Sequence, residues 1–142
     1  CWEQYSSGNA LVREARELAA ERRTEAAVLL QMGDGTPEGV SGLHITAAAR
    51  EGDPVALEAF DRVGAWLGSG LADLASLFDP AMFVIGGGVS EAGDLIVEPA
   101  RRAFMESLVA REHRPVAPVV VASLGNDAGL VGAADLARDL TR

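Results

Sequence analysis

Three consecutive glycines carry the strongest chemical signal within the chain. Gly86, Gly87 and Gly88 directly follow AMFVI, a short apolar run that is typical of a buried strand. Glycine has no Cβ, so the backbone can turn sharply and come close to a ligand, and ligands of open α/β sheets bind beyond the carboxyl ends of strands. A dinucleotide fingerprint would need a further glycine where Glu91 stands. The pattern therefore favours a mononucleotide site, with a tight turn that binds nothing as the alternative.

A second segment, SLGNDAGLVGAADLA, has the same layout of a strand end followed by the start of a helix. Asp127 is placed to cap that helix. Small residues in the helix favour close packing against another element; these are Gly129, Gly132, Ala133 and Ala134. We favour a structural role for this segment over catalysis. The alternative is that this segment contacts a nucleotide bound at the glycine turn.

The other residue types that could do chemistry are isolated from one another. Cys1 is the only cysteine, and Glu3 follows two residues later. Zinc needs three or four protein ligands, and neither His44 nor His113 has a cysteine or carboxylate at ligand spacing. From spacing alone, Cys1 is a free thiol, the histidines are surface or loop residues, and Glu3 has no assigned role. Trp2 is expected to lie in the core.

Composition excludes several function classes. The chain has 142 residues, about one domain, and a formal charge of −9, which disfavours binding to phosphate backbones and anionic lipids. It contains no lysine, which removes both the lysine of a phosphate-binding loop and a Schiff-base lysine. Apolar runs are too short to cross a bilayer. We predict a cytoplasmic protein that binds neither nucleic acid nor membrane.

The elements that position these residues alternate between helix and strand. Residues 7–25 show helical spacing of apolar residues, 31–42 form a glycine-rich loop, and a short helix is expected at 45–50. Asp53 and Pro54 are typical of a helix start, here of a long helix that reaches residue 78. Strands are expected at 81–85 and 118–124, and helices at 94–111 and 127–140.

These strands and helices predict an α/β fold. Two apolar strands joined by a helix form a right-handed crossover, so the sheet should be parallel and covered on both faces. Two strands are too few for a stable sheet, so we expect further strands from sequence outside this chain. Gly64, Gly68 and Gly70 lie inside the long helix, where glycine weakens helix propensity. They predict that another element comes close to this helix, and Trp66 between them is expected to be buried.

Several motifs in a fixed order resemble the ROK family of bacterial sugar kinases and repressors. They are CWEQYSSGNAL at the start, AAAREGDPVALEAFDRVGAWLGSGLADLASLFDPAMFVIGGGVS in the middle and LGNDAGLVGAADLA near the end. The likeness covers nearly the whole chain and is strongest to the family's ATP-dependent glucokinases. It implies a lobe of the actin and hexokinase (ribonuclease H-like) ATPase fold. Residues 1–52 would be an inserted helical segment and 53–142 the α-β-α-β-α half of the nucleotide-binding lobe, with the N-terminal lobe absent.

The resemblance also implies roles for single residues. Cys1 would be one thiolate ligand of a structural Zn²⁺ whose other two cysteines and histidine precede this chain. Glu3 would bind sugar hydroxyls, and the turn at 86–88 would bind the adenosine of ATP. An aspartate outside the chain would take the proton of the glucose 6-hydroxyl, and Mg²⁺ would accompany ATP. The chain alone should therefore be inactive.

Other members of the family give the alternatives. One is a sugar-responsive transcriptional repressor, and another is a kinase for a different hexose such as N-acetylmannosamine or fructose. The resemblance further implies a homo-oligomer, either a dimer or a tetramer, with glucose and ATP as the small-molecule partners. The chain opens without methionine or a leader, so we expect a segment of a longer protein.

Overall fold

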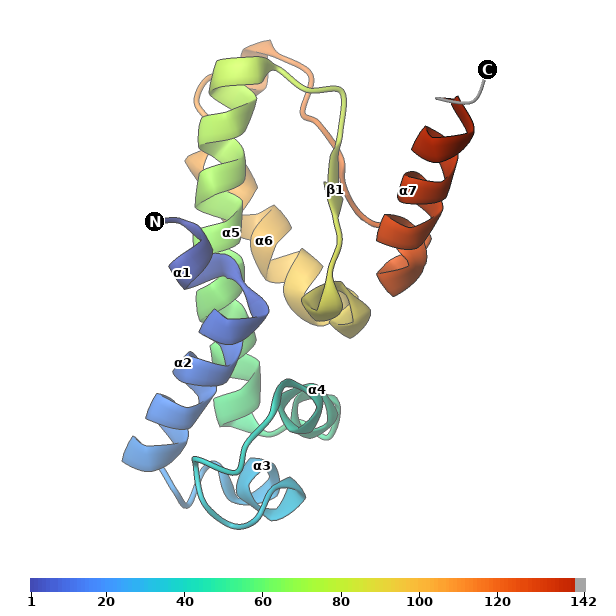
Figure 1. Cartoon of the computed structure of the whole chain (residues 1–142). Coiled ribbons are helices and arrows are strands. Elements are labelled where there is room, and N and C mark those ends of the chain that lie inside the picture. The colour runs from blue at the N-terminus through green and yellow to red at the C-terminus, as the bar shows by residue number, and fades with distance from the viewer. Residues whose placement is uncertain (140–142) are drawn as a thin grey trace.

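The long helix α5 is the centre of the computed structural model, which describes residues 1–139 (Figure 1). The elements in order are α1 (Glu3–Ser6), α2 (Gly8–Glu21), α3 (Ala27–Met32), α4 (Gly42–Arg50), α5 (Pro54–Phe78), β1 (Phe83–Ile85), the 3-10 turn η1 (Gly88–Ala92), α6 (Asp94–Ser107), the 3-10 turn η2 (Arg111–His113), β2 (Val119–Val121), the 3-10 turn η3 (Gly125–Asp127) and α7 (Ala128–Asp139). The expected order of helices and strands is therefore present. Position 140, the expected end of the last helix, lies outside the described residues.

The start of α5 agrees with the sequence expectation and adds a contact that the sequence did not show. Asp53 is buried, and its Oδ1 accepts hydrogen bonds from the backbone N–H groups of Val55 and Ala56 at 3.0 and 2.9 Å. Its Oδ2 accepts another from the backbone N–H of Leu29 at 2.9 Å, in α3. One carboxylate thus caps α5 and holds α3 against it. The sequence pattern had not predicted α3.

Two of the α5 glycines permit the close approach of α6. A Cβ built on Gly64 would lie 2.5 Å from the Cβ of Pro99, and one on Gly68 would lie 2.6 Å from the backbone nitrogen of Phe104. Real Cβ atoms do not come that close to backbone atoms of a neighbouring helix, so α5 and α6 pack backbone to backbone. The prediction of close approach at these positions is confirmed.

The third glycine, Gly70, lies beneath α1. A Cβ there would overlap the indole of Trp2, whose Nε1 donates a hydrogen bond to the carbonyl oxygen of Trp66 at 2.8 Å. The ring of Tyr5 packs on Trp66 with centroids 4.8 Å apart. Trp2 and Trp66 are nevertheless 40% and 52% exposed, so the expectation that both are core residues was wrong. The indole of Trp2 lies on the outer surface of α5, where Gly70 leaves room for it.

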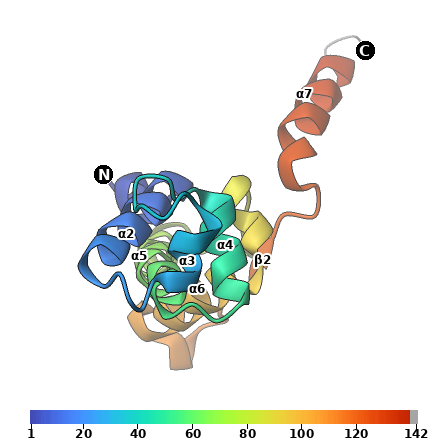
Figure 2. The same cartoon turned by 90° about the horizontal axis from the view of Figure 1, so that it is seen from below.

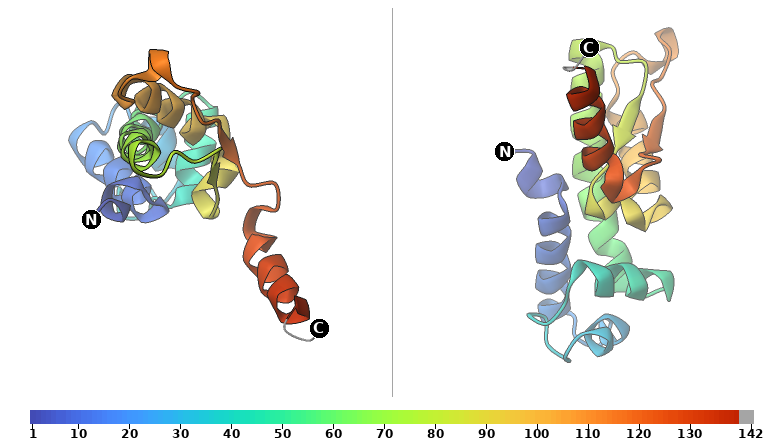
Figure 3. Two further views of the ribbon diagram at one scale, coloured as in Figure 1. Left: turned by 90° about the horizontal axis from the view of Figure 1, so that it is seen from above. Right: turned by 45° about the vertical axis from the view of Figure 1, so that its right-hand side comes forward.

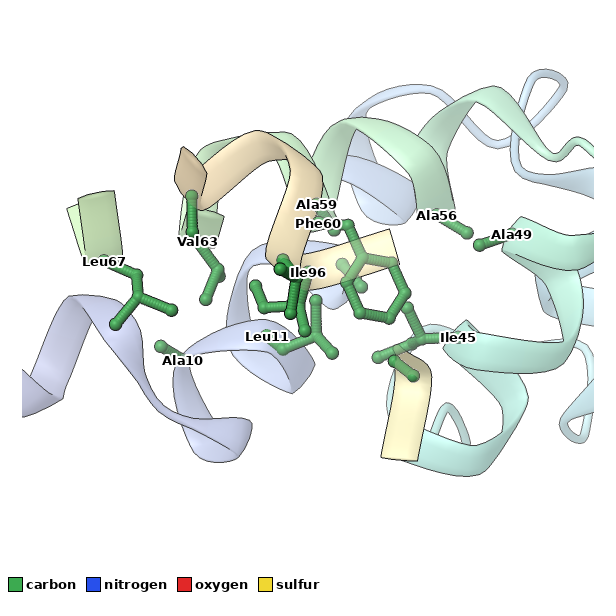
Figure 4. Packing of buried hydrophobic residues seen from close by; sticks show 14 of the residues in the cluster. Ala10, Leu11, Ile45, Ala49, Ala56, Ala59, Phe60, Val63, Leu67 and Ile96 are labelled. Carbon is green, nitrogen blue, oxygen red and sulfur yellow. The ribbon is translucent and has the colours of Figure 1, made fainter. Parts of the chain in front are cut away.

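The hydrophobic core joins residues from both halves of the sequence. Leu11 of α2, Ile45 of α4, Phe60 of α5 and Ile96 of α6 are at most 2% exposed and belong to one cluster (Figure 4). Helices α2, α3 and α4 surround the lower part of α5, and α6 packs on α5 around its middle, at Gly64 and Gly68 (Figures 1 and 3). The position of η1, which precedes α6, is thereby fixed relative to α4.

Ion pairs add a surface link between α2 and α5. Arg22 donates to a carboxylate oxygen of Glu58, and Arg62 donates to the other at 2.8 Å. The Arg22 guanidinium, by hydrogen bonding, lowers the pKa of Glu58 below its ordinary value. Because these side chains are 32% to 48% exposed, solvent screens the pairs and the link contributes little to stability.

The sheet contains β1 and β2 in parallel, with Phe83, Val84 and Ile85 opposite Val119, Val120 and Val121. Helix α6 covers one face. The ring of Phe104 meets Phe83 edge to face at 5.7 Å, and Arg101 donates twice to the carbonyl oxygen of Val119, at 3.0 and 2.6 Å. Val84 is 55% exposed, so the expectation of cover on both faces was wrong for the described residues.

The last helix stands apart from the other elements (Figures 1 and 2). The apolar side chains of Leu130 and Leu136 on α7 are 73% and 70% exposed. Asp127, expected as its cap, lies in η3 immediately before it. No helix in the described part of the chain is both long and apolar enough to span a membrane.

Candidate functional site

The glycine turn after β1 has a backbone that only glycine adopts without strain. Gly87 has a φ of +83°, and a Cβ at Gly87 or Gly88 would have no atom within 4 Å. The side chain of Ser90 is buried, and its hydroxyl donates to the carbonyl oxygen of Gly87 at 2.7 Å. The backbone N–H of Ser90 donates to the same oxygen at 3.0 Å. Ser90 thus fixes the conformation of the turn, while the space next to Gly87 and Gly88 is free of other protein atoms among the described residues.

In front of the turn lies a cavity of about 740 Å³. Three segments line it: the junction of α1 with α2, helix α4, and the glycine turn with η1. The lining residues are Ser6, Ser7, Gly8, Leu11, Ser41, Gly42, Leu43, Thr46, Ala47, Arg50, Gly86, Gly87, Gly88, Val89 and Glu91. This volume falls in the range of small-molecule sites. The predicted glycine residues therefore border a cavity of the size that a nucleotide needs.

Two helices begin at this cavity. Ser7 caps α2 by accepting a hydrogen bond from the backbone N–H of Ala10, and Ser41 caps α4 by accepting from that of His44 at 3.4 Å. The backbone N–H of Ser41 donates to Nδ1 of His44 at 3.3 Å, so this histidine is part of the cap. Helix N-termini carry partial positive charge and favour anions. This end of the cavity therefore suits phosphate oxygens.

Charged side chains on the cavity wall are few. Among the described lining residues, Arg50 is the only cationic side chain and Glu91 the only anionic one. Nη2 of Arg50, at the C-terminal end of α4, lies 3.5 Å from the backbone carbonyl oxygen of Glu91 in η1. This contact joins the two walls of the cavity at the end of α4 opposite to its cap.

The two N-terminal candidates, Cys1 just before α1 and Glu3 at its start, do not line the large cavity. Glu3 is exposed and lines neither this cavity nor the smaller one near Cys1. Residues three apart on a helix share a face, so Glu3 lies on the same face as Ser6, which does line the large cavity. Cys1 is exposed and borders a separate hollow of about 430 Å³ with Trp2, Tyr5 and Trp66. The structure thus brings the C-terminal end of α1, but neither Glu3 nor Cys1 itself, to the cavity in front of the glycine turn.

Metal ligands are too sparse here for a complete site. Within residues 1–139, no three side chains of the types His, Cys, Asp and Glu gather where they could hold a metal ion. Cys1 can offer one thiolate, while a structural zinc site takes four ligands. The described residues by themselves do not fit zinc.

The second glycine segment lies close to the first. Turn η3 packs against η1, and a Cβ on Gly86 would come within 3.7 Å of the Cβ of Ala122, which follows β2. The expected proximity of LGNDAG to the glycine turn is therefore present, although the described lining of the cavity does not include it.

Sequence reasoning missed most of the wall opposite the glycine turn. Leu43, Thr46, Ala47 and Arg50 of α4 face the cavity together with Ser41. A usable signal was the serine at positions 7 and 41, since serine is a preferred N-cap residue. Two such starts in one cavity could not be foreseen, because their meeting depends on how α2 and α4 pack on α5.

Comparison with known proteins gives consistent matches. The model of the ROK family matches residues 1–140. A glucokinase of Streptomyces coelicolor is 56% identical over 139 residues. A ROK family glucokinase from Streptomyces griseus, solved in complex with glucose and AMPPNP, superposes with a TM-score of 0.95 at 56% identity. A ROK family transcriptional regulator superposes with a TM-score of 0.64 at 27% identity, over 84% of this chain and 28% of its own.

This chain aligns with only part of the length of each of these relatives. The alignments cover 98% of this chain but 44% of the Streptomyces coelicolor enzyme and 45% of the Streptomyces griseus chain. The chain thus spans less than half the length of the relatives it matches.

Proposed function

The chain belongs to the ROK family, and on that premise we propose that it forms the nucleotide-binding part of an ATP-dependent glucokinase. The intact protein would transfer the γ-phosphate of ATP to the 6-hydroxyl of glucose. The observation that carries this proposal is the meeting of the glycine turn and the segment after α1 at one cavity. Gly86–Gly88 and Ser6, which lies three residues after Glu3 on α1, border the same cavity. A nucleotide held at the glycine turn could then extend its γ-phosphate toward a sugar at Glu3, as direct phosphoryl transfer requires.

Identity favours the kinase over the regulator. The chain is 56% identical to a curated glucokinase over almost its whole length, whereas the regulator is 27% identical over a smaller part. The glucokinase from Streptomyces griseus was solved with glucose and an ATP analogue, which supports the same pair of substrates here.

Residue roles follow from this proposal. The turn at 86–88 would hold the adenosine, and the carboxylate of Glu3 would accept hydrogen bonds from two sugar hydroxyls. Cys1 would add one thiolate to a structural Zn²⁺ whose other ligands lie outside this chain. Bound Mg²⁺ would offset charge on the phosphates. We assign the general base to an aspartate outside the chain, and we propose that the enzyme is a cytoplasmic homo-oligomer.

An activity assay of the intact protein tests the proposal. We expect ATP-dependent phosphorylation of glucose with higher kcat/KM than that of fructose or N-acetylmannosamine. The rate can be followed by coupling ADP release to NADH oxidation. A protein that phosphorylates none of these sugars but binds DNA in a sugar-dependent manner would be the repressor of the family instead.

For the acceptor site, Glu3→Ala should weaken glucose binding about ten- to a hundredfold. The reason is the loss of a charged hydrogen-bond acceptor, which is worth about 1.5–3 kcal/mol. Isothermal titration of glucose into the intact protein measures the change, and metal analysis should show unchanged zinc content. Glu17→Ala is the matched control, because Glu17 is an exposed carboxylate on α2 that lines neither of the two cavities described above. Unchanged glucose affinity in Glu3→Ala would remove the acceptor role.

A further inference from the structure

The large cavity is polarised from one end of α4 to the other. At the N-terminal end of α4, the starts of α2 and α4 both meet the cavity and favour negative charge. Helix α1, which carries Glu3, reaches the cavity through Ser6 at its junction with α2. On the proposed function, the γ-phosphate must lie near the sugar. The triphosphate then belongs at the junction of α1 with α2.

The opposite end of the cavity has a different chemical character. Arg50 is the last residue of α4, so it lies about 12 Å along the helix axis from Gly42. Between these ends, Leu43, Ala47 and Val89 supply apolar surface to the cavity wall. A flat apolar ring fits such a wall, and a distance of this order separates the base of a nucleoside triphosphate from its terminal phosphates.

We propose that Arg50 binds the base of the nucleotide by stacking on it. Its guanidinium is exposed and already reaches across the cavity to η1, where Nη2 lies 3.5 Å from the carbonyl oxygen of Glu91. A planar guanidinium stacks well on an aromatic ring and is attracted to its face. The base would lie between α4 and the glycine turn with Arg50 over it. The inference rests on the proposed nucleotide site but adds the orientation of the nucleotide within it.

Binding of two partial ligands tests the two ends of the cavity separately. Adenosine has the base without phosphates, and tripolyphosphate has the phosphates without a base. In Arg50→Ala of the intact protein we expect the calorimetric Kd for adenosine to rise about tenfold, the scale of a lost cation–π contact. The Kd for tripolyphosphate should stay within twofold, and Arg50→Lys should lie between the wild type and the alanine variant for adenosine.

Arg23→Ala is the matched control, since Arg23 is also an exposed arginine that donates to a backbone carbonyl, that of Gly35, but does not line the cavity. It should leave both Kd values unchanged. The proposal is overturned if Arg50→Ala raises the Kd for tripolyphosphate as much as the Kd for adenosine, or if it changes neither Kd. It is also overturned if the wild type does not bind adenosine. These are binding measurements, so they are independent of activity. A wild type that binds adenosine through Arg50 but does not phosphorylate glucose would refute only the proposed function.

Discussion

Gly68→Val is expected to lower the free energy of unfolding by about 3 kcal/mol or more. Even the Cβ of the new side chain would lie 2.6 Å from the backbone nitrogen of Phe104 and 2.7 Å from the Cβ of Ala103, and it would overlap the carbonyl oxygen of Ala100. Backbone atoms of α6 cannot move aside singly, so the two helices would have to separate. Overpacking of a core by one or two methyl groups costs about 1–3 kcal/mol, and more where backbone is displaced. Urea denaturation of the intact protein followed by circular dichroism measures the change.

The matched control is Gly132→Ala on α7. A Cβ at that position would meet no atom within 4 Å, and alanine is the better helix former by about 1 kcal/mol. This variant should therefore be as stable as the wild type or more stable. If Gly68→Val unfolded at the same urea concentration as the wild type, the backbone contact between α5 and α6 would not exist as described.

Asp53→Ala is the second change with a large expected effect, about 3 kcal/mol of lost stability. The substitution removes the acceptor of three backbone N–H groups, those of Leu29, Val55 and Ala56, and the site is buried, so water does not replace it. Loss of an N-cap costs about 1 kcal/mol, and each buried donor left without an acceptor costs about 1–3 kcal/mol, partly relieved by relaxation. Thermal unfolding of the intact protein should show a lower Tm.

Asp61→Ala is the matched control, because it also removes a carboxylate at α5 but not one that caps the helix. Asp61 is an exposed residue of α5 whose carboxylate pairs with Arg102 at 3.0 Å, with both side chains 59% exposed. Exposed pairs contribute about 0–1 kcal/mol, so its removal should hardly change the Tm. Equal effects of Asp53→Ala and Asp61→Ala would show that Asp53 does not join α3 to α5.

Local signals in the sequence predicted the elements that they specify directly. Asp53 and Pro54 marked the start of α5, and the glycines at 64, 68 and 70 marked its contacts, because each effect depends on a few neighbouring residues. Helix α3 escaped prediction because the N–H group of Leu29, in its first turn, is bonded to Asp53, a residue outside the helix. The division into residues 1–52 and 53–142 stays a prediction.

The candidate site was predictable only in part. The turn at 86–88 was visible because each glycine costs conformational entropy on folding, so three in a row after a strand indicate a sharp turn or a close approach. The wall formed by Leu43 and Arg50 was not visible, since nothing near these residues in the sequence marks them as facing a cavity. Trp2 and Trp66 were misjudged for a related reason: size and apolarity do not say which face of a helix a ring occupies. The roles of Cys1 and Glu3 stay predictions that rest on the family.

Packing on α5 has a consequence for motion of the intact protein, if that protein is the proposed kinase. The indole of Trp2 packs over Gly70 and thereby connects α1 to α5. Gly64 and Gly68 let α6, the helix that follows η1, pack closely on the same helix. On the proposed function, the acceptor and donor segments are both packed on α5, and their spacing is set by the helical rise between these glycines. Any hinge closure that brings the reacting groups together would therefore move this part as a single body against its partner lobe.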